Sequence, residues 1–216
     1  MRHFAIIAAS FVCLAQPAAA ERYDGCSAPQ SAVVEDALNS AKSLTLKAAS
    51  AVADTPDYRR WFGRYSVSNA EKVRFSLKSM VTAIRGGAVT VRCNQSNAQG
   101  CSAGEYAFVF ANAPYLVHMC PPFFDLPHLE ALRPGMRRSE NGTREGTIVH
   151  ELSHFLRVAG TEDHCYSREV CADMASRDPR RAIDNADSYQ YFTEDVTYFA
   201  RQPLTNKPSP PLRTDR

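Results

Sequence analysis

The sequence feature that most constrains the fold of this chain is a His-Glu-x-x-His pentapeptide at residues 150–154. On an α-helix, positions four apart share one face, so the imidazoles of His150 and His154 can reach one tetrahedral zinc ion. Glu151 would then lie beside the open position of the metal, where a general base acts. The chain contains only 6 His, which makes a chance match rare. The alternative is two hydrogen-bonded core histidines, with Glu151 as a surface charge.

The residues around the pentapeptide suit a buried helix. Apolar side chains cover most of the helix circumference, at Ile148, Val149, Leu152, Phe155, Leu156 and Val158. Gly160 follows them and would end the helix, as a C-terminal glycine does. A helix with this pattern is mostly buried, so the two histidines and the glutamate are its polar exceptions.

The first 20 residues have the pattern of a secretory signal peptide. A charged start at Arg2 is followed by an apolar run over residues 4–15 and by small residues up to Ala20, after which cleavage is expected. The apolar run is too short for a membrane-spanning helix, and no other stretch approaches the required length. We therefore expect a secreted protein, extracellular or, in a Gram-negative source, periplasmic. Its folded domain would cover residues 21–202, and a disordered, proline-rich tail residues 203–216.

Charge and cysteine content narrow the partners and the compartment. The formal net charge is +2, and one less once Arg2 is removed, which gives no reason to expect a nucleic-acid or membrane partner. We expect a monomer that acts on a peptide or protein. Loss of Cys13 with the signal peptide leaves an even number of cysteines in an oxidising compartment, and this favours three disulfides. They are Cys26, Cys93, Cys101, Cys120, Cys165 and Cys171.

Hydrophobic periodicity predicts a mostly helical α+β domain. Long helices are expected over residues 31–54 and 69–84, with a helical turn around Trp61 between them. Residues 88–93, 106–110 and 115–120 alternate like strands and predict a small antiparallel sheet over the motif helix. The stretch 121–139 is expected to be an irregular surface loop, and residues 168–175 and 183–199 to be helices.

The sequence offers several candidates for a third metal ligand, because a catalytic zinc takes three protein ligands and keeps one position open. They are Glu162, Asp163, His164, Glu169 and Asp173. A metzincin would carry glycine three residues after His154 and histidine six after it; Arg157 and Gly160 stand there, so that class is excluded. Glu169 and Asp173 have the form of a thermolysin-like ligand helix, but they follow the motif closely. From the residues alone, a helix ligand and a loop ligand both stay open.

The loop after the motif helix carries a second pattern, Gly160-Thr161-x-Asp163-x-x-Tyr166. Together with the pentapeptide it resembles the aspzincins, the deuterolysin and peptidyl-Lys metallopeptidase family of secreted zinc endopeptidases. The resemblance covers about residues 93–199 and includes the segment 185–192. One departure is that the family has a glycine after the tyrosine, where this chain has Ser167.

The resemblance implies a zincin-like single catalytic domain with one Zn²⁺ per chain. His150, His154 and Asp163 would bind the metal. Glu151 would be the general base, and Tyr166 would steady the oxyanion. The competing interpretations are a solvated loop acid or helix cap for the aspartate, and an ordinary core or surface aromatic for the tyrosine.

The resemblance also implies a disulfide pairing. In this pairing, one disulfide joins an N-terminal cysteine to the strand expected over residues 88–93. A second lies within the two strands that follow and their connections, and the third lies beside the loop after the motif helix. The pairs would be Cys26 with Cys93, Cys101 with Cys120, and Cys165 with Cys171.

The implied reaction is hydrolysis of peptide bonds by a zinc-bound water that Glu151 deprotonates. In the lysine-preferring relatives, an acid in Asn-Ala-Asp and another acid three residues on bind the lysine ammonium. This chain has Asp187 and Gln190 there, so a basic residue after the scissile bond would be favoured without strict lysine specificity. The competing interpretation of Asp187 is a helix-surface charge. Substrate would lie as an added strand along residues 106–110 or 115–120.

Two other functions share the zinc site. One is an exported hydrolase of cell-wall peptides or a toxin, and the other is a zinc-bound binding module without turnover. An intact Glu151 argues against the binding module, because a binder needs no base at that position.

Overall fold

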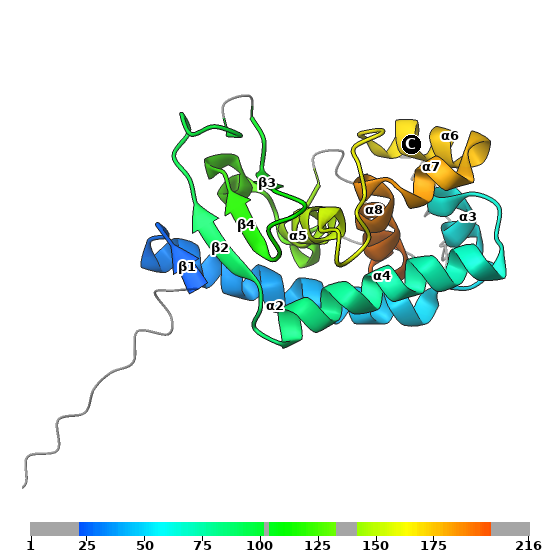
Figure 1. Ribbon diagram of the computed structural model, residues 1–216, viewed down its shortest axis with the longest axis horizontal. Helices are drawn as coiled ribbons and strands as arrows, with labels where there is room; N and C mark the ends of the chain where they lie inside the picture. The colour runs from blue at the N-terminus through cyan, green and yellow to red at the C-terminus, as the bar shows by residue number, and fades with distance from the viewer. Residues whose placement is uncertain (1–21, 102–103, 133–141, 200–216) are drawn as a thin grey trace, which may run out of the picture.

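The computed structural model describes residues 22–101, 104–132 and 142–199, so the expected signal peptide and C-terminal tail lie outside the described residues. Two long helices run side by side in opposite directions (Figure 1): α2 (Ala28–Ala51) and α4 (Val67–Arg85). A capping box between Ser27 and Gln30 starts α2 three residues before the expected position. The apolar positions of α4 are buried, as its periodicity predicted: Val73, Leu77, Met80, Val81 and Ile84.

The short helix α3 (Pro56–Phe62) follows α2 and supplies the aromatic part of the core. Thr55 caps it, and Pro56 occupies its first turn, where no hydrogen-bond donor is needed. Trp61 is fully buried, and its indole nitrogen donates to Asp195 at 3.0 Å. The expected helical turn around the tryptophan is therefore confirmed.

The sheet is mixed, which corrects the expected antiparallel arrangement. Its strands are β1 (Tyr23–Asp24), β2 (Thr90–Cys93), β3 (Ala107–Val109) and β4 (Leu116–Met119), in the order β1-β2-β4-β3. Only β3 and β4 are antiparallel; β2 is parallel to both of its neighbours. The long connection after β2 carries the chain past the position of β4 to the edge strand β3. Alternating hydrophobicity predicts strands but not their direction, and β1 is too short to give such a pattern.

The helix of the pentapeptide is α5 (Arg144–His154), which starts at the cap residue Thr143 and contacts β3 and α8. It ends at His154, so the expectation that it continues to Gly160 was wrong. Phe155 has an extended backbone (φ −61°, ψ 129°), and Leu156 N donates to Ala111 O at 3.0 Å. This contact with the end of the edge strand turns the chain back on itself directly after the second histidine.

The C-terminal part contains α6 (Arg168–Arg177), α7 (Pro179–Ile183) and α8 (Ala186–Thr197). The helix expected over residues 183–199 therefore starts three residues later. The described part of the expected loop 121–139 forms the 3₁₀ turns η1 (Pro121–Asp125) and η2 (Leu129–Ala131), and their residues Phe123 and Leu129 are fully buried. That stretch is thus not wholly a surface loop.

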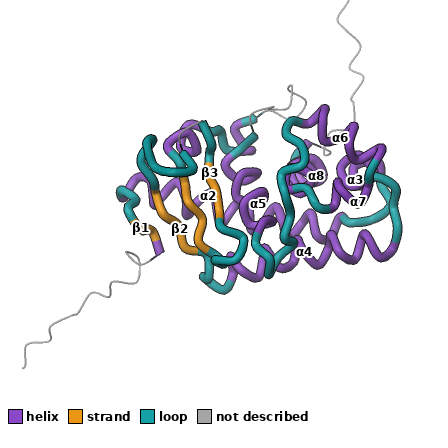
Figure 2. Tube along the Cα trace, turned by 45° about the horizontal axis from the view of Figure 1, so that its top comes forward, coloured by secondary structure: helices purple, strands orange, loops and turns teal. Residues whose placement is uncertain are grey.

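The sheet lies at one end of the molecule and α3, α6 and α7 at the other, with α5 and α8 between them (Figures 1 and 2). Three disulfides join the pairs that the family resemblance implied: Cys26–Cys93, Cys101–Cys120 and Cys165–Cys171. None of the described helices is both long enough and apolar enough to span a membrane. A cleft lined by β3, by α8 and by the loop after α5 leaves one face of α5 open.

Candidate metal centre and substrate cleft

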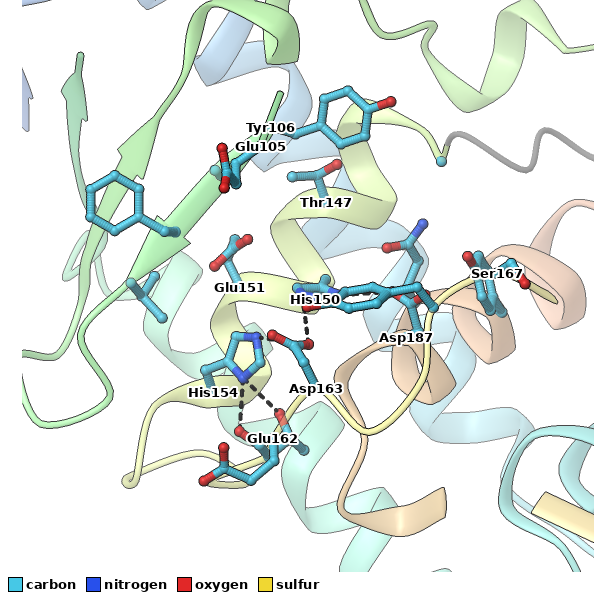
Figure 3. A pocket seen from close by; sticks show the side chains of 18 of the residues that line it. Glu105, Tyr106, Thr147, His150, Glu151, His154, Glu162, Asp163, Ser167 and Asp187 are labelled. Atoms are coloured by element: carbon cyan, nitrogen blue, oxygen red, sulfur yellow. Dashed lines mark hydrogen bonds and ion pairs between the residues drawn. The ribbon is translucent and has the colours of Figure 1, made fainter. Parts of the chain in front are cut away.

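Two imidazoles and one carboxylate converge on the open face of α5 (Figure 3). Oδ1 of Asp163 lies 3.2 Å from Nε2 of His150 and 3.5 Å from Nε2 of His154. Ligand atoms bound to one tetrahedral zinc, each at roughly 2.0–2.1 Å, are separated by about 3.3 Å. Both distances from Asp163 match the separation that one zinc ion requires, and all three donor atoms lie within 4.8 Å of one another.

Asp163 reaches this position because the chain folds back after α5. Thr161 N donates to Ser153 O at 3.2 Å, and the two hydroxyls are 2.6 Å apart. Glu162 then pairs with Asn185 in a short parallel bridge, which ties the loop to the start of α8. The two residues just before the aspartate are thus tied to α5 and to the start of α8.

The other nitrogen of each imidazole also has a partner. Nδ1 of His150 lies 2.8 Å from Oδ1 of Asp187, and Nδ1 of His154 lies 2.7 Å from the carbonyl oxygen of Thr161. Such partners fix the ring orientation and keep the outer nitrogen free to bind metal. Asp187 is only 5 % exposed, so it is not a helix-surface charge.

Burial and neighbouring charges set the protonation of the site. Burial raises the pKa of Glu151 above its usual range. Burial acts to lower the pKa of His150, but hydrogen bonds to Asp163 and Asp187 outweigh it and hold this pKa well above its ordinary value. Burial, followed by the charge of Asp163, raises the pKa of Tyr166 to about 12. The phenol therefore stays protonated and can donate a hydrogen bond at neutral pH.

A cleft of about 640 Å³ surrounds these groups and is lined by every site residue predicted from the sequence. They are His150, Glu151, His154, Asp163, Tyr166, Asp187 and Gln190. The edge strand β3 forms the opposite wall, whereas β4 is enclosed between β2 and β3. Of the two stretches expected to bind a substrate strand, 106–110 and 115–120, only residues 106–110 are therefore open to a peptide.

Gln190 lies deep in the cleft wall, with 5 % of its surface exposed. A Cβ atom at Gly142 or Gly146 would come within 2.9 Å of its amide nitrogen. The amide therefore packs directly on the backbone at the start of α5, and at Gly146 the Glu194 carboxylate would lie closer still to a Cβ atom. Together these contacts explain why glycine stands at the two positions.

Three of the rival ligands point elsewhere, and Glu162, which lines the cleft, is not part of the group of three donors. Nε2 of His164 lies 3.1 Å from Asp184, and Asp173 pairs with Arg177 on the surface of α6. Glu169 is exposed on the same helix. Within the described parts of the chain, the only group of three donors with metal-binding spacing is that of α5 and Asp163.

Two features of the site escaped sequence reasoning. The carbonyl of Thr161 holds His154, and a backbone acceptor leaves no signal in the sequence. Glu105 lines the cleft just before β3, where an isolated acid in a loop has no distinctive pattern. Ser167, at the family's glycine position, has a glycine-like backbone with φ 71° and ψ 154°.

Comparisons with known proteins identify the family of this chain. A family model described as lysine-specific metallo-endopeptidase, of the aspzincin type, matches residues 47–194. The peptidyl-Lys metalloendopeptidase of Pleurotus ostreatus is 32% identical over 174 residues, which cover 79% of this chain and 94% of that protein. An extracellular protease of Aeromonas hydrophila is 33% identical over 175 residues, 79% of this chain but 46% of that protein.

The fold has a counterpart among solved structures. A zinc peptidase from Grifola frondosa superimposes with a TM-score of 0.67 at 29% identity, covering 79% of this chain and 97% of the other. The chain spans about half the length of the Aeromonas relative and of the curated Grifola peptidyl-Lys metalloendopeptidase, which is 30% identical to it. Since the family match extends over more than half of the sequence and the fold agrees with it, this chain belongs to the aspzincin family of metalloendopeptidases.

Proposed function

We propose that this chain is an exported, zinc-dependent endopeptidase that favours a basic residue on the carboxyl side of the scissile bond. The observation that carries the proposal is the placement of one carboxylate oxygen within 3.5 Å of both outer imidazole nitrogens. His150, His154 and Asp163 would hold one zinc ion. When bound, zinc supplies a Lewis acid that acidifies water and polarises a peptide carbonyl.

Glu151 is the candidate general base. It is buried in the cleft wall, one residue after the first of the two histidines. Its pKa is raised, and a carboxylate with a raised pKa is better able both to accept a proton and to return it at neutral pH. It would accept a proton from the attacking water and pass it to the leaving amine.

Tyr166 is the candidate oxyanion donor. It follows Asp163 by three residues in the loop between the metal site and α6, and its side chain is 61 % exposed at the cleft. A protonated phenol at this place can donate to the developing negative charge on the carbonyl oxygen.

Export is supported by the signal-like N-terminal sequence, by three disulfides, and by the name of the Aeromonas relative. Disulfides of this kind persist in oxidising compartments. The names of the relatives from Pleurotus and Grifola, both peptidyl-Lys metalloendopeptidases, support a preference for a basic residue at the scissile bond.

The mechanism is tested by replacing Glu151 with Gln in the full chain. We expect peptide hydrolysis to fall by at least about 100-fold while bound zinc, measured by elemental analysis, stays at the wild-type level. The exposed Glu169→Gln on α6 makes the same change of charge outside the cleft and should retain activity. Undiminished hydrolysis by E151Q would refute the mechanism.

The substrate class is tested by profiling a peptide library with the zinc-loaded protein. Cleavage of linear peptides before basic residues supports the proposal. Cleavage confined to cell-wall peptides would favour the alternative hydrolase, and zinc binding without any cleavage would favour a binding module.

A further inference from the structure

The carboxylate that orients His150 is itself buried. Oδ1 of Asp187 lies 2.8 Å from Nδ1 of His150, on the side of the imidazole that faces α8 (Figure 3). Asp187 is only 5 % exposed, so little water reaches its carboxylate. A buried carboxylate needs hydrogen bonds from the protein to keep its charge and its orientation. The bond to His150 supplies one of them, and a second donor is needed to fix the plane of the group.

Tyr191 is that second donor. It follows Asp187 by four residues on α8, so the two side chains lie on one face of the helix. The Tyr191 phenol forms a hydrogen bond to the Asp187 carboxylate. Burial, followed by the charge of Asp187, raises the pKa of Tyr191 well above its ordinary value. The phenol therefore keeps its proton at neutral pH and acts as the donor of this bond.

The ring of Tyr191 is held by packing on two buried side chains. The guanidinium carbon of Arg168 lies 4.5 Å from the centre of the ring, and the Trp61 ring lies 5.0 Å from it. Both neighbours are tied to one carboxylate: Arg168 pairs with Asp195 at 2.8 Å, and the Trp61 indole nitrogen donates to it at 3.0 Å. The phenol oxygen is thus held in a fixed position beside Asp187 by contacts from α3 and α6.

We propose that Tyr191 is a positioning residue for the metal centre: its phenol fixes Asp187, and Asp187 in turn orients the imidazole of His150 for zinc. This inference rests on the proposed zinc site. A carboxylate bonded only to His150 would rotate about its last side-chain bond at little cost, because that torsion has broad minima. The imidazole would then lose its fixed orientation, and a less well oriented ligand binds metal more weakly.

The test is a double-mutant cycle on zinc affinity, measured by chelator competition with the full chain. Tyr191→Phe removes the hydroxyl and keeps the ring. We expect it to raise the Kd for zinc about threefold to tenfold, less than loss of a direct partner of a ligand would. In an Asp187→Asn background the same change should alter the Kd by less than about twofold, because the carboxylate through which the phenol acts is gone.

Tyr189→Phe is the matched control. It removes the hydroxyl of another fully buried tyrosine on α8, whose ring packs against Phe62. It should leave the zinc Kd unchanged, together with the visible absorption spectrum of the Co²⁺-loaded protein. That spectrum reports the arrangement of the metal ligands, so Y191F should change it. A role of Tyr191 in stability alone would lower the free energy of unfolding and leave the Co²⁺ spectrum and the zinc Kd as in wild type.

A zinc affinity of Y191F equal to or above that of wild type would overturn the inference and leave the endopeptidase function intact. An equal effect of Tyr191→Phe with Asp187 and with Asn at that position would also overturn it, because the phenol would then act by another route. If the wild-type protein neither binds zinc nor cleaves peptides, the proposed function fails and this inference fails with it.

Discussion

Replacing Ser167 with glycine should stabilise this protein. Ser167 is the only non-glycine residue with a positive φ in the described parts of the chain, and its ψ of 154° places it in a region that is almost restricted to glycine. It connects the loop of Asp163 and Tyr166 to α6 and lies between the half-cystines Cys165 and Cys171. These neighbours hold the backbone in place, so the serine side chain must accept the unfavourable geometry.

The size of the effect follows from two opposing contributions. A non-glycine residue in such a conformation costs about 1–3 kcal/mol. Against this, glycine destabilises the folded protein by roughly 0.5–1 kcal/mol, because it has more conformational freedom to lose when the unfolded chain folds. The Ser167 hydroxyl makes no capping hydrogen bond to α6, so no such bond is lost. The net gain should be about 1 kcal/mol, or a Tm increase of about 2–4 °C for a chain of this size.

Thermal and denaturant unfolding measure this gain directly. The protein with Ser167 and the variants compared with it should all carry Glu151→Gln to prevent self-digestion. Their disulfides should be intact and zinc should be removed by a chelator. Ser167→Ala is the matched control: it removes the hydroxyl but keeps the Cβ atom, so it should not stabilise. If S167G unfolds at the same temperature as S167A, or below wild type, the strain argument is wrong.

Two further predictions concern buried carboxylates. Asp187→Asn should weaken zinc binding about 10-fold to 100-fold, because it replaces the carboxylate partner of His150; chelator competition measures this, and wild-type affinity would contradict it. Burial raises the pKa of Glu194 from 4.5 to about 7, although Arg168 opposes this. The folded protein therefore holds a proton that the unfolded chain releases, and stability from this group falls as pH rises from about 4.5 to about 7. Denaturant titrations at several pH values give the unfolding free energies of wild type and Glu194→Gln. The value for the variant minus that for wild type should rise by up to about 3 kcal/mol between about pH 4.5 and about pH 7. A difference that does not change with pH would contradict the prediction.

The elements that sequence analysis predicted well are those whose signal is local. The apolar spacing of Val73, Leu77 and Met80 identified α4, and the pentapeptide with its apolar flanks identified α5. Both signals come from residues one helical turn apart, which interact within the element itself. The disulfide pairing was available only through family resemblance, because six cysteines allow about fifteen pairings and spacing does not choose among them.

Strand direction and the end of α5 were predicted wrongly for a common reason. Both depend on contacts with distant parts of the chain. The apolar residues Phe155 and Leu156 continue a helical pattern, but the backbone of Leu156 instead donates to Ala111 at the end of the edge strand. A local pattern cannot compete with a hydrogen bond to a residue 45 positions earlier, and the helix stops where that bond forms.

The candidate third ligand shows the same dependence on distant contacts most clearly. Asp163 and His164 are adjacent, and both side chains bind zinc well, so the residues alone could not choose between them. The choice is made by Asn185, whose side-chain oxygen accepts from the backbone nitrogens of His164 at 2.9 Å and Cys165 at 3.1 Å. These bonds fix the loop so that His164 turns to Asp184 while Asp163 faces the two histidines. A buried amide at the start of α8, some 20 residues further along the chain, thus decides which side chain faces the two histidines.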